Sequence, residues 1–220
     1  MLVQDLWRSG CQWDDKIDDT SYKKWKYWVQ VMRNINTLKL PRSYFGKAKS
    51  TEIRNLQLHI FSDANAEAYG CVGYYRAIVR GEVLCALVMS RSKVAPIKQL
   101  SVPRLELLAA VLEARLRKTI KENHSISVEK TVHWVDANVV LSWIRSDQRR
   151  YKQFVGFRIR EIHSLTKLCD WRWVPTRLNV ADQLTKWGKD PEMDSTWPEF
   201  LYKPEPEWPK VELQPANTTE

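Results

Sequence analysis

The sequence is short of cysteine and has neither a long apolar run nor internal repeats. Its 4 cysteines in 220 residues stand singly, with no C-x-x-C pair, which argues against a zinc site or a disulfide framework and favours a reduced, intracellular setting. No apolar run approaches the roughly 18 residues of a membrane span, and residues 1–8 lack the apolar core of a secretory signal. We therefore expect no membrane partner.

The overall composition is that of a folded, basic domain. Hydrophobic residues make up 44% and charged residues 28% of the chain, which excludes a wholly disordered protein. Lys and Arg number 35 against 26 Asp and Glu, so the net charge is +9, and there are 11 tryptophans. A basic and aromatic chain is compatible with a nucleic-acid partner, although a basic surface without any partner has the same composition.

A helical segment and a proline-rich tail flank the central region. Trp25, Trp28 and Met32 recur at helical spacing in residues 1–48, which predicts an amphipathic helix whose apolar face must be buried. Six of the ten prolines follow residue 189. We therefore expect residues 189–220 to form an extended tail.

The central region, residues 49–188, predicts a sheet covered by helices. Alternating apolar residues predict strands over residues 55–63, 69–76, 82–91, 131–136 and 170–174. Apolar residues at helical spacing predict helices over residues 101–123, 138–145, 154–168 and 179–186. This order of elements is typical of an α/β fold with a mixed five-stranded sheet flanked by helices.

One acidic residue marks each of four predicted elements, in the order Asp63, Glu106, Asp136 and Asp182. Two of them end strands, where sheets with helices on their faces tend to host sites. If those strands are neighbours, the four carboxylates converge at one edge of the sheet. Crowded carboxylates repel one another unless a hard divalent cation binds, and two such ions can promote hydrolysis of a phosphodiester.

Each carboxylate taken singly also fits a purely structural role. Asp63 would begin a turn with Asn65, and Asp136 would cap the helix that follows it. Glu106 and Asp182 would stabilise the first turn of a helix through its dipole. The residues alone leave both interpretations open.

Four blocks of sequence contain these acids. They are LHIFSDA at 58–64, PRLELLAA at 103–110, WVDANVVLSWI at 134–144, and WRWVPT at 171–176 followed by NVADQLT at 179–185. In this order, the blocks resemble the ribonuclease H region of BEL/Pao-type (Pao family) LTR retrotransposon pol polyproteins.

The resemblance implies a ribonuclease H-like fold and a metal-dependent endonuclease. The reaction would be cleavage of the RNA strand of an RNA/DNA hybrid during reverse transcription, leaving a 3′-hydroxyl without a covalent intermediate. The catalytic metal ligands implied by position, for two Mg²⁺ ions or Mn²⁺ as a substitute, are Asp63, Glu106, Asp136 and Asp182.

The resemblance extends to both ends of the chain. Residues 1–48, with LW at 6–7, WDD at 13–15 and LPR at 40–42, are similar to the connector between reverse transcriptase and ribonuclease H. Residues 189–220, with PEFLY at 198–202 and EWP at 207–209, are similar to the linker toward integrase. The chain lacks a Y-x-D-D polymerase motif and the zinc-binding set of an integrase. The implied partners are those two parts of the same polyprotein, in the cytoplasm or the nucleus.

Three departures from the family pattern concern the site. Ala137 stands where a small hydroxyl residue is frequent, and Val180 stands where proline is common. No histidine lies between Val174 and Asp182, where many ribonucleases H have one on a loop. His163, in the preceding predicted helix, is expected to be a surface or core residue.

Basic residues near the predicted site are candidates for contacting the phosphates of a hybrid, because such an enzyme recognises backbone and duplex shape. They are Arg104, beside Glu106, and the cluster of Arg149, Arg150 and Lys152. Any single one of them also fits ordinary solvated surface.

Two other functions compete with the nuclease. A decayed or non-catalytic fragment of a retroelement would bind nucleic acid without cleaving it, although the presence of all four acids favours the enzyme. A transposase or integrase core would use Glu161 as its last acid, but the NVADQLT block argues against it.

Overall fold

A computed structural model describes residues 2–35, 41–186 and 197–210. The chain divides into two units, Met1–Arg42 and Ser43–Glu220. The first unit contains helices α1 (Leu2–Arg8) and α2 (Asp19–Asn34), and neither helix has a buried residue. Trp25 and Trp28 on α2 are 44% and 49% exposed, so the described residues of the first unit do not bury this aromatic face. Asp18 caps α2 by accepting hydrogen bonds from the backbone amides of Thr20 and Ser21.

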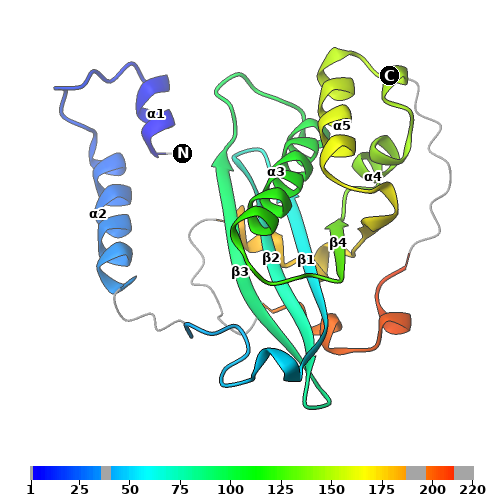
Figure 1. The fold of residues 1–220 in the computed structure, drawn as a ribbon. Coiled ribbons are helices and arrows are strands. Elements are labelled where there is room, and N and C mark those ends of the chain that lie inside the picture. Colours follow the sequence, from blue (N-terminus) through cyan, green and yellow to red (C-terminus); the bar gives the residue numbers. More distant parts are fainter. Residues whose placement is uncertain (1, 36–40, 187–196, 211–220) are drawn as a thin grey trace. The chain divides into compact units, whose positions relative to one another are not determined.

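The second unit is built on a five-stranded mixed sheet (Figure 1). The strands are β1 (Ile53–Ala64), β2 (Ala68–Val79), β3 (Glu82–Val94), β4 (Lys130–Val135) and β5 (Trp171–Trp173). Their spatial order is β3-β2-β1-β4-β5. The first three strands form an antiparallel meander, whereas β4 pairs in parallel with both β1 and β5. The predicted mixed five-stranded sheet is therefore confirmed.

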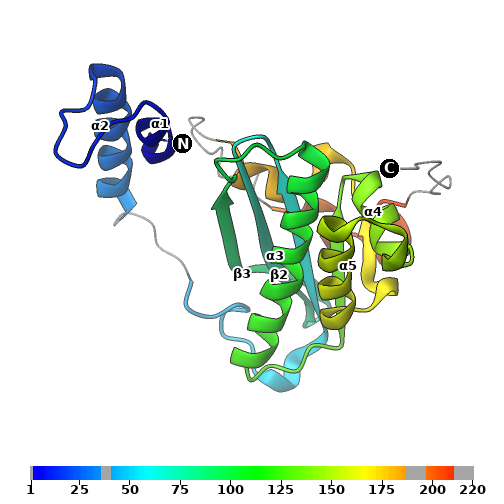
Figure 2. The same cartoon turned by 90° about the horizontal axis from the view of Figure 1, so that it is seen from above.

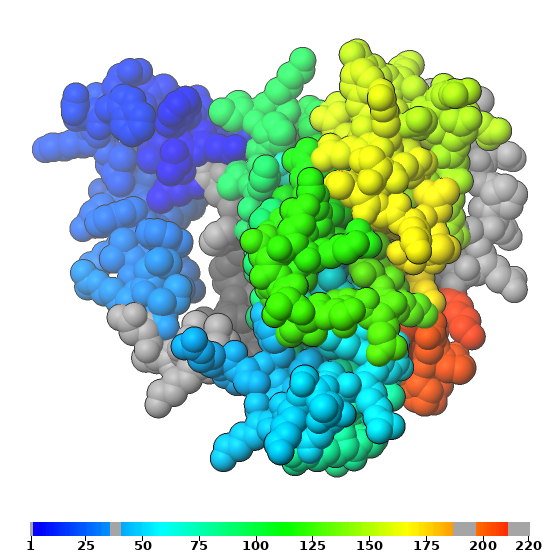
Figure 3. Space-filling model, in the orientation of Figure 1, coloured from blue at the N-terminus to red at the C-terminus, as the bar shows by residue number. Residues whose placement is uncertain are grey.

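Three helices cover one face of this sheet, with α3 beside α5 (Figures 2 and 3). They are α3 (Val102–Asn123), α4 (Asn138–Arg145) and α5 (Gln153–Leu165). The predicted last helix, residues 179–186, was wrong in type, because the chain forms only a 3₁₀ helix over Val180–Leu184. Hydrogen bonds hold both ends of this short element. The Asn179 side chain accepts from the Ala181 amide, and the Thr185 amide donates to the Asp182 carbonyl.

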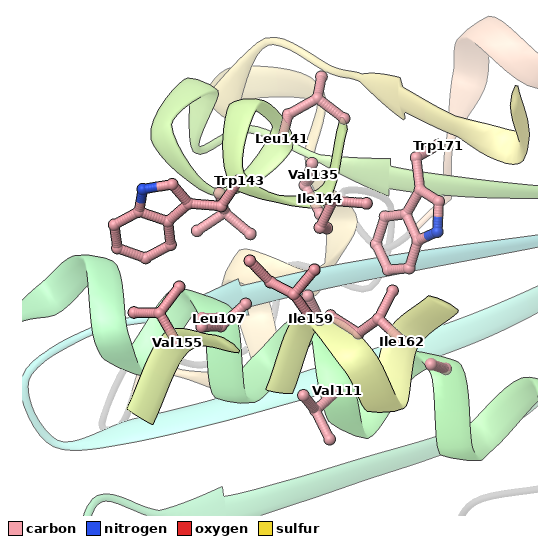
Figure 4. Packing of buried hydrophobic residues seen from close by; sticks show 13 residues of the cluster. Leu107, Val111, Val135, Leu141, Trp143, Ile144, Val155, Ile159, Ile162 and Trp171 are labelled. Carbon is pink, nitrogen blue, oxygen red and sulfur yellow. The ribbon is translucent and has the colours of Figure 1, made fainter. Parts of the chain in front are cut away.

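The core between the helices and the sheet is formed by large apolar side chains (Figure 4). Trp143 lies in this core, as its spacing in the sequence predicts. The buried residues labelled in Figure 4 come from α3, β4, α4, α5 and β5, and they are Leu107, Val111, Val135, Leu141, Trp143, Ile144, Val155, Ile159, Ile162 and Trp171.

The opposite face of the sheet is covered by the C-terminal part of the chain. Residues 197–210 depart from the expected extended tail, because they fold into two 3₁₀ helices, Glu199–Tyr202 and Glu205–Glu207. Phe200, Leu201 and Trp208 are buried there against sheet residues that include Phe61 and Trp134. A sheet face with such aromatic side chains would be costly to leave in water, which explains why this segment packs on it.

Polar contacts also fix the C-terminal segment. Arg76, on β2, donates to the Leu201 carbonyl over 2.6 Å. The Glu205 carboxylate accepts from Lys130 and from Arg172, with both distances 2.6 Å. Burial of the aromatic side chains and these charge-assisted hydrogen bonds together make residues 197–210 part of the second unit.

The N-terminal boundary of the second unit makes a testable prediction. Phe45 is buried in a core cluster, and the Tyr44 ring lies 5.1 Å from the ring of Tyr75. Removing residues 1–42 should leave the melting temperature nearly unchanged, because α1 and α2 bury nothing. Removing residues 1–48 should lower it by about 6 °C or more, since loss of a buried Phe side chain costs about 3–5 kcal/mol.

Melting curves of the two shortened proteins and of the full chain test this prediction. Phe45→Ala in the full chain is the matched control and should reproduce most of the loss. Equal melting temperatures for the two shortened proteins would contradict it.

Candidate metal centre and nucleic-acid interface

Three carboxylates meet at one edge of the sheet. Asp63 lies at the end of β1, Asp136 directly follows β4, and Glu106 lies near the start of α3. Ligand oxygens of the three lie within 4.8 Å of one another. The pairing of β1 with β4 explains this. The two strands are parallel, and Phe61 pairs with Trp134, so each acid follows its paired residue by two positions.

Asp63 does not make the turn that was its alternative role. That turn is stabilised by Asn65, whose side-chain oxygen accepts from the backbone amides of Glu67 and Ala68 at 2.8 Å each. The Asp63 carboxylate is buried and instead accepts a 2.7 Å hydrogen bond from the Thr185 hydroxyl. Its orientation is therefore fixed toward the site by a residue 122 positions later in the chain.

Asp136 does not cap the following helix. The residue at the N-cap of α4 is Ala137, and no side chain caps that helix. The side chains of Thr176 and Asn179 hydrogen-bond to the Asp136 carboxyl. Its Oδ1 atom is buried and has no hydrogen-bond partner among the described residues. An unpaired buried carboxylate oxygen is costly, and a bound cation would satisfy it.

Burial makes it difficult for this cluster to carry its full negative charge. Burial, with the charges of Asp136 and Asp182 adding to it, raises the pKa of Asp63 to about 6. Burial and the charges of Asp63 and Asp136 raise the pKa of Glu106 to about 9. Burial also raises the pKa of Asp136. A divalent cation would stabilise the ionised forms and remove the mutual repulsion.

The fourth predicted acid, Asp182, lies beside this cluster rather than in it. It belongs to the 3₁₀ helix Val180–Leu184, and its carboxylate pairs with the Lys186 ammonium. Its charge nevertheless contributes to the raised pKa values of Asp63 and Asp136. The structure thus brings three of the four acids together and places the fourth within electrostatic reach.

The donor set fits a hard divalent cation. Carboxylate oxygens are the ligands that Mg²⁺ and Mn²⁺ prefer, and a site with three of them needs no sulfur or imidazole donor. The buried, unpartnered Oδ1 of Asp136 points to the same chemistry. The residues that would hold the ion are Asp63, Glu106 and Asp136.

The predicted basic residues lie at the surface around the start of α5. Arg149, Arg150 and Lys152 are exposed in the connection between α4 and α5, and none of them forms an ion pair with another residue in the described part of the chain. Arg104 is also exposed, and its guanidinium lies 5.2 Å from the centre of the Phe154 ring. This contact places Arg104, two residues from Glu106, next to the start of α5.

Two residues considered at the sequence level have other partners. Glu161, the last acid that a transposase core would need, forms an ion pair with Arg115 through two contacts of 2.5 and 3.0 Å. His163 hydrogen-bonds through Nε2 to the Ile144 carbonyl at 2.8 Å. Neither residue belongs to the carboxylate cluster.

Several residues that shape the site were not predicted. Thr185 and Asn179 lie in the NVADQLT block, where only Asp182 was given a role. Glu113 and His133 form a buried pair beneath the cluster. The available signal was polarity, because Glu113 interrupts the apolar face of α3 and His133 stands among the apolar residues of β4.

The strand order and the site at the end of β1 and β4 define a ribonuclease H-like fold. The family model described as "Pao retrotransposon-like RNaseH-like domain" matches residues 1–137, so the chain belongs to this family. The matched stretch includes Asp63, Glu106 and Asp136 and ends before Asp182. A search of the curated proteins found no match to this chain.

Solved structures similar to the chain include ribonuclease H proteins. The N-terminal RNase H domain of a Mycobacterium tuberculosis protein, fused to maltose-binding protein, is 11% identical with a TM-score of 0.42, covering 64% of this chain and 94% of that one. RNase H1 of the archaeon Halobacterium salinarum is 9% identical with a TM-score of 0.35, covering 56% and 88%. LC11-RNase H1 in complex with an RNA/DNA hybrid is 7% identical with a TM-score of 0.39, covering 59% and 92%.

None of the helices in the described residues is long and apolar enough to span a membrane.

The raised pKa values predict how the stability of the metal-free protein depends on pH. A carboxyl whose pKa is higher in the folded state binds more protons when folded, so the free energy of unfolding falls as pH rises between the two pKa values. That interval runs from 3.8 to about 6 for Asp63 and from 4.5 to about 9 for Glu106. The contribution of the cluster to stability should therefore decrease from about pH 4 to about pH 9.

Urea unfolding in EDTA at about pH 5, 7 and 9 measures this dependence. Glu106→Gln should flatten the decline between about pH 6 and 9, because that variant has no carboxyl to ionise there. Saturating Mg²⁺ should also flatten it. The assignment is wrong if Glu106→Gln and the unchanged protein lose stability equally over this range.

Proposed function

We propose that this chain is a ribonuclease H-type endoribonuclease that cleaves the RNA strand of RNA/DNA hybrids during retrotransposon reverse transcription. The observation that carries the proposal is the meeting of Asp63, Glu106 and Asp136 within 4.8 Å at the ends of two parallel strands. Membership of the Pao retrotransposon-like family supports the retroelement setting.

The proposed cofactor is a pair of Mg²⁺ ions, with Mn²⁺ as a substitute. Asp63, Glu106 and Asp136 would be ligands, and Asp182 would complete the set after exchanging Lys186 for an ion. When bound, the ions would activate water and stabilise the leaving oxygen of the phosphodiester. The contribution of the chain is to hold the carboxylates in place through hydrogen bonds from Thr185 to Asp63 and from Asn179 to Asp136.

The proposed hybrid-binding surface consists of Arg104, Arg149, Arg150 and Lys152. Their side chains are exposed, and within residues 2–35, 41–186 and 197–210 they are not neutralised by ion pairs. A substrate of arbitrary sequence has to be bound through its phosphates, which guanidinium and ammonium groups suit. Arg104 would contact the strand nearest to Glu106, and the other three would contact the duplex farther along.

We also propose a place for this domain within a polyprotein. Residues 1–48 would connect to reverse transcriptase, and residues 189–220 would lead toward integrase, in a particle in the cytoplasm or in the nucleus. The open aromatic face of α2 supports contact with another part of the polyprotein. Residues 43–48 and 197–210 would additionally stabilise the nuclease fold on which they pack.

The decisive experiment incubates the purified chain with an RNA/DNA hybrid labelled in the RNA strand, with and without Mg²⁺. We expect cleavage that depends on the metal and leaves 3′-hydroxyl ends. Asp136→Asn should lower the rate by at least about 100-fold, because it removes one ligand charge from a two-metal site. Its melting temperature without metal should hold or rise, since the change also removes repulsion.

Glu161→Gln is the matched control, because Glu161 is an acid outside the cluster and should not be needed for cleavage. Cleavage by Asp136→Asn at the rate of the unchanged protein would refute the role of Asp136. If the unchanged protein binds the hybrid but never cleaves it, the chain is a non-catalytic retroelement fragment instead.

The basic surface makes a separate prediction. Arg149→Ala combined with Arg150→Ala should weaken hybrid binding and reduce the log–log salt slope by roughly one unit for each lost phosphate contact. Filter binding in EDTA over a series of salt concentrations measures this slope without cleavage. Lys118→Ala with Lys121→Ala, which removes the same charge from the far end of α3, should leave the slope nearly unchanged. Equal slopes for the two double variants would make Arg149 and Arg150 ordinary surface residues.

A further inference from the structure

A buried acid–base pair lies beneath the carboxylate cluster. Glu113, on α3, and His133, on β4, are both 0% exposed, and a 2.8 Å hydrogen bond joins Glu113 Oε1 to His133 Nδ1. The proposed reaction assigns neither residue a role. The ring of Trp171 stacks on His133 with centres 4.5 Å apart, which fixes the plane of the imidazole.

Burying these two polar side chains in the core costs free energy. Burial raises the pKa of Glu113 and lowers that of His133 to about 3, so both side chains favour their neutral forms. His133 Nε2 has no hydrogen-bond partner among the described residues, which adds to the cost. Apolar side chains of similar volume would often be at least as stable at such a position. A contribution to packing alone does not account for the pair.

Glu113 contacts the strands that lead to Asp63 and Asp136 and lies on the helix that carries Glu106. The Ser62 side chain, on β1, and the Trp134 backbone, on β4, also interact with the Glu113 carboxyl and partly offset the effect of burial on its pKa, while its Oε2 has no hydrogen-bond partner among the described residues. Ser62 immediately precedes Asp63, and Trp134 lies two residues before Asp136. Glu113 itself follows Glu106 by seven residues on the same helix, which is about two turns, or about 10 Å along its axis. The Glu113 carboxyl therefore links α3 to β4 and lies against β1, about two helical turns from Glu106.

We propose that Glu113 and His133 are positioning residues that fix the spacing of Asp63, Glu106 and Asp136. The sheet alone aligns β1 with β4, but it does not set the height or rotation of α3 above them. Apolar packing holds α3 on the sheet, and the hydrogen bond from Glu113 to His133 adds a directional link that fixes its position against β4. The functional part of this proposal rests on the proposed nuclease activity, whereas its structural and metal-binding parts do not.

The test compares Glu113→Ala, Glu113→Gln and Val111→Ala. Glu113→Gln keeps an acceptor and the side-chain volume, and Val111→Ala removes buried apolar contacts on the same helix without touching the pair. Amide NMR spectra of the metal-free proteins report on the site residues, and calorimetric titration with Mn²⁺ reports on their ability to bind metal. Hybrid cleavage supplies kcat and KM separately.

Glu113→Ala should shift the amide signals of Asp63, Glu106 and Asp136 and weaken Mn²⁺ binding about 10-fold or more, as loss of groups that orient metal ligands does. In hybrid cleavage, kcat should fall while KM stays nearly constant. Glu113→Gln should restore most of both properties. Val111→Ala should lower the melting temperature but leave the site signals and the Mn²⁺ affinity unchanged.

The proposal is overturned if Glu113→Ala changes the site signals and the Mn²⁺ affinity no more than Val111→Ala does, or if Glu113→Gln restores neither. Should Glu113→Ala fail to fold, Ser62→Ala removes only the link to β1 and should still move the Asp63 signal and weaken Mn²⁺ binding. No change in Ser62→Ala would likewise overturn it. An unchanged protein that binds Mn²⁺ but does not cleave hybrids would refute the proposed function and leave this comparison valid.

Discussion

The parallel pairing of β1 with β4 is the constraint on which the candidate site depends. Because Phe61 pairs with Trp134, Asp63 and Asp136 emerge at the same height from adjacent strands, where the chain leaves the sheet. A shift of one residue would turn one of these acids to the opposite face, since side chains alternate along a strand. Strand register, which backbone hydrogen bonds and core packing determine, therefore sets the distance between two charged groups that repel each other.

That repulsion explains the polar side chains around the cluster. Thr185, Asn179 and Thr176 hydrogen-bond to Asp63 or Asp136, and all three come from the segment that follows β5. These hydrogen bonds replace part of the hydration that the carboxylates lose on burial. They leave Oδ1 of Asp136 without a partner in the described residues. The protein thus stabilises the positions of these groups more completely than it stabilises their charge, which is the arrangement that a cation-binding site requires.

Much of this architecture follows from local sequence pattern. Alternation and helical spacing identified the strands and α3, and polarity at strand ends identified Asp63 and Asp136. Local sequence pattern did not predict the structure correctly where tertiary contacts determine the local conformation. The proline-rich sequence around Phe200 and Trp208 is typical of a linker, and only the open aromatic face of the sheet gives it a place to pack. Residues 179–186 have the apolar spacing of a helix, but contacts from Asn179 and Thr185 hold them in a 3₁₀ turn. Likewise, no local feature of Glu113 or His133 reveals that they meet.

The packing of residues 197–210 has a consequence for the order of folding during synthesis. Arg76 bonds to Leu201, 125 positions later in the chain, so part of the second face of the sheet stays uncovered until the ribosome has released almost the whole domain. Contacts of such long sequence separation slow folding and leave apolar surface exposed in the meantime. A chain that ended before residue 197 would lack Phe200, Leu201 and Trp208, so it would expose more of Phe61 and Trp134 to water and would be more prone to aggregation.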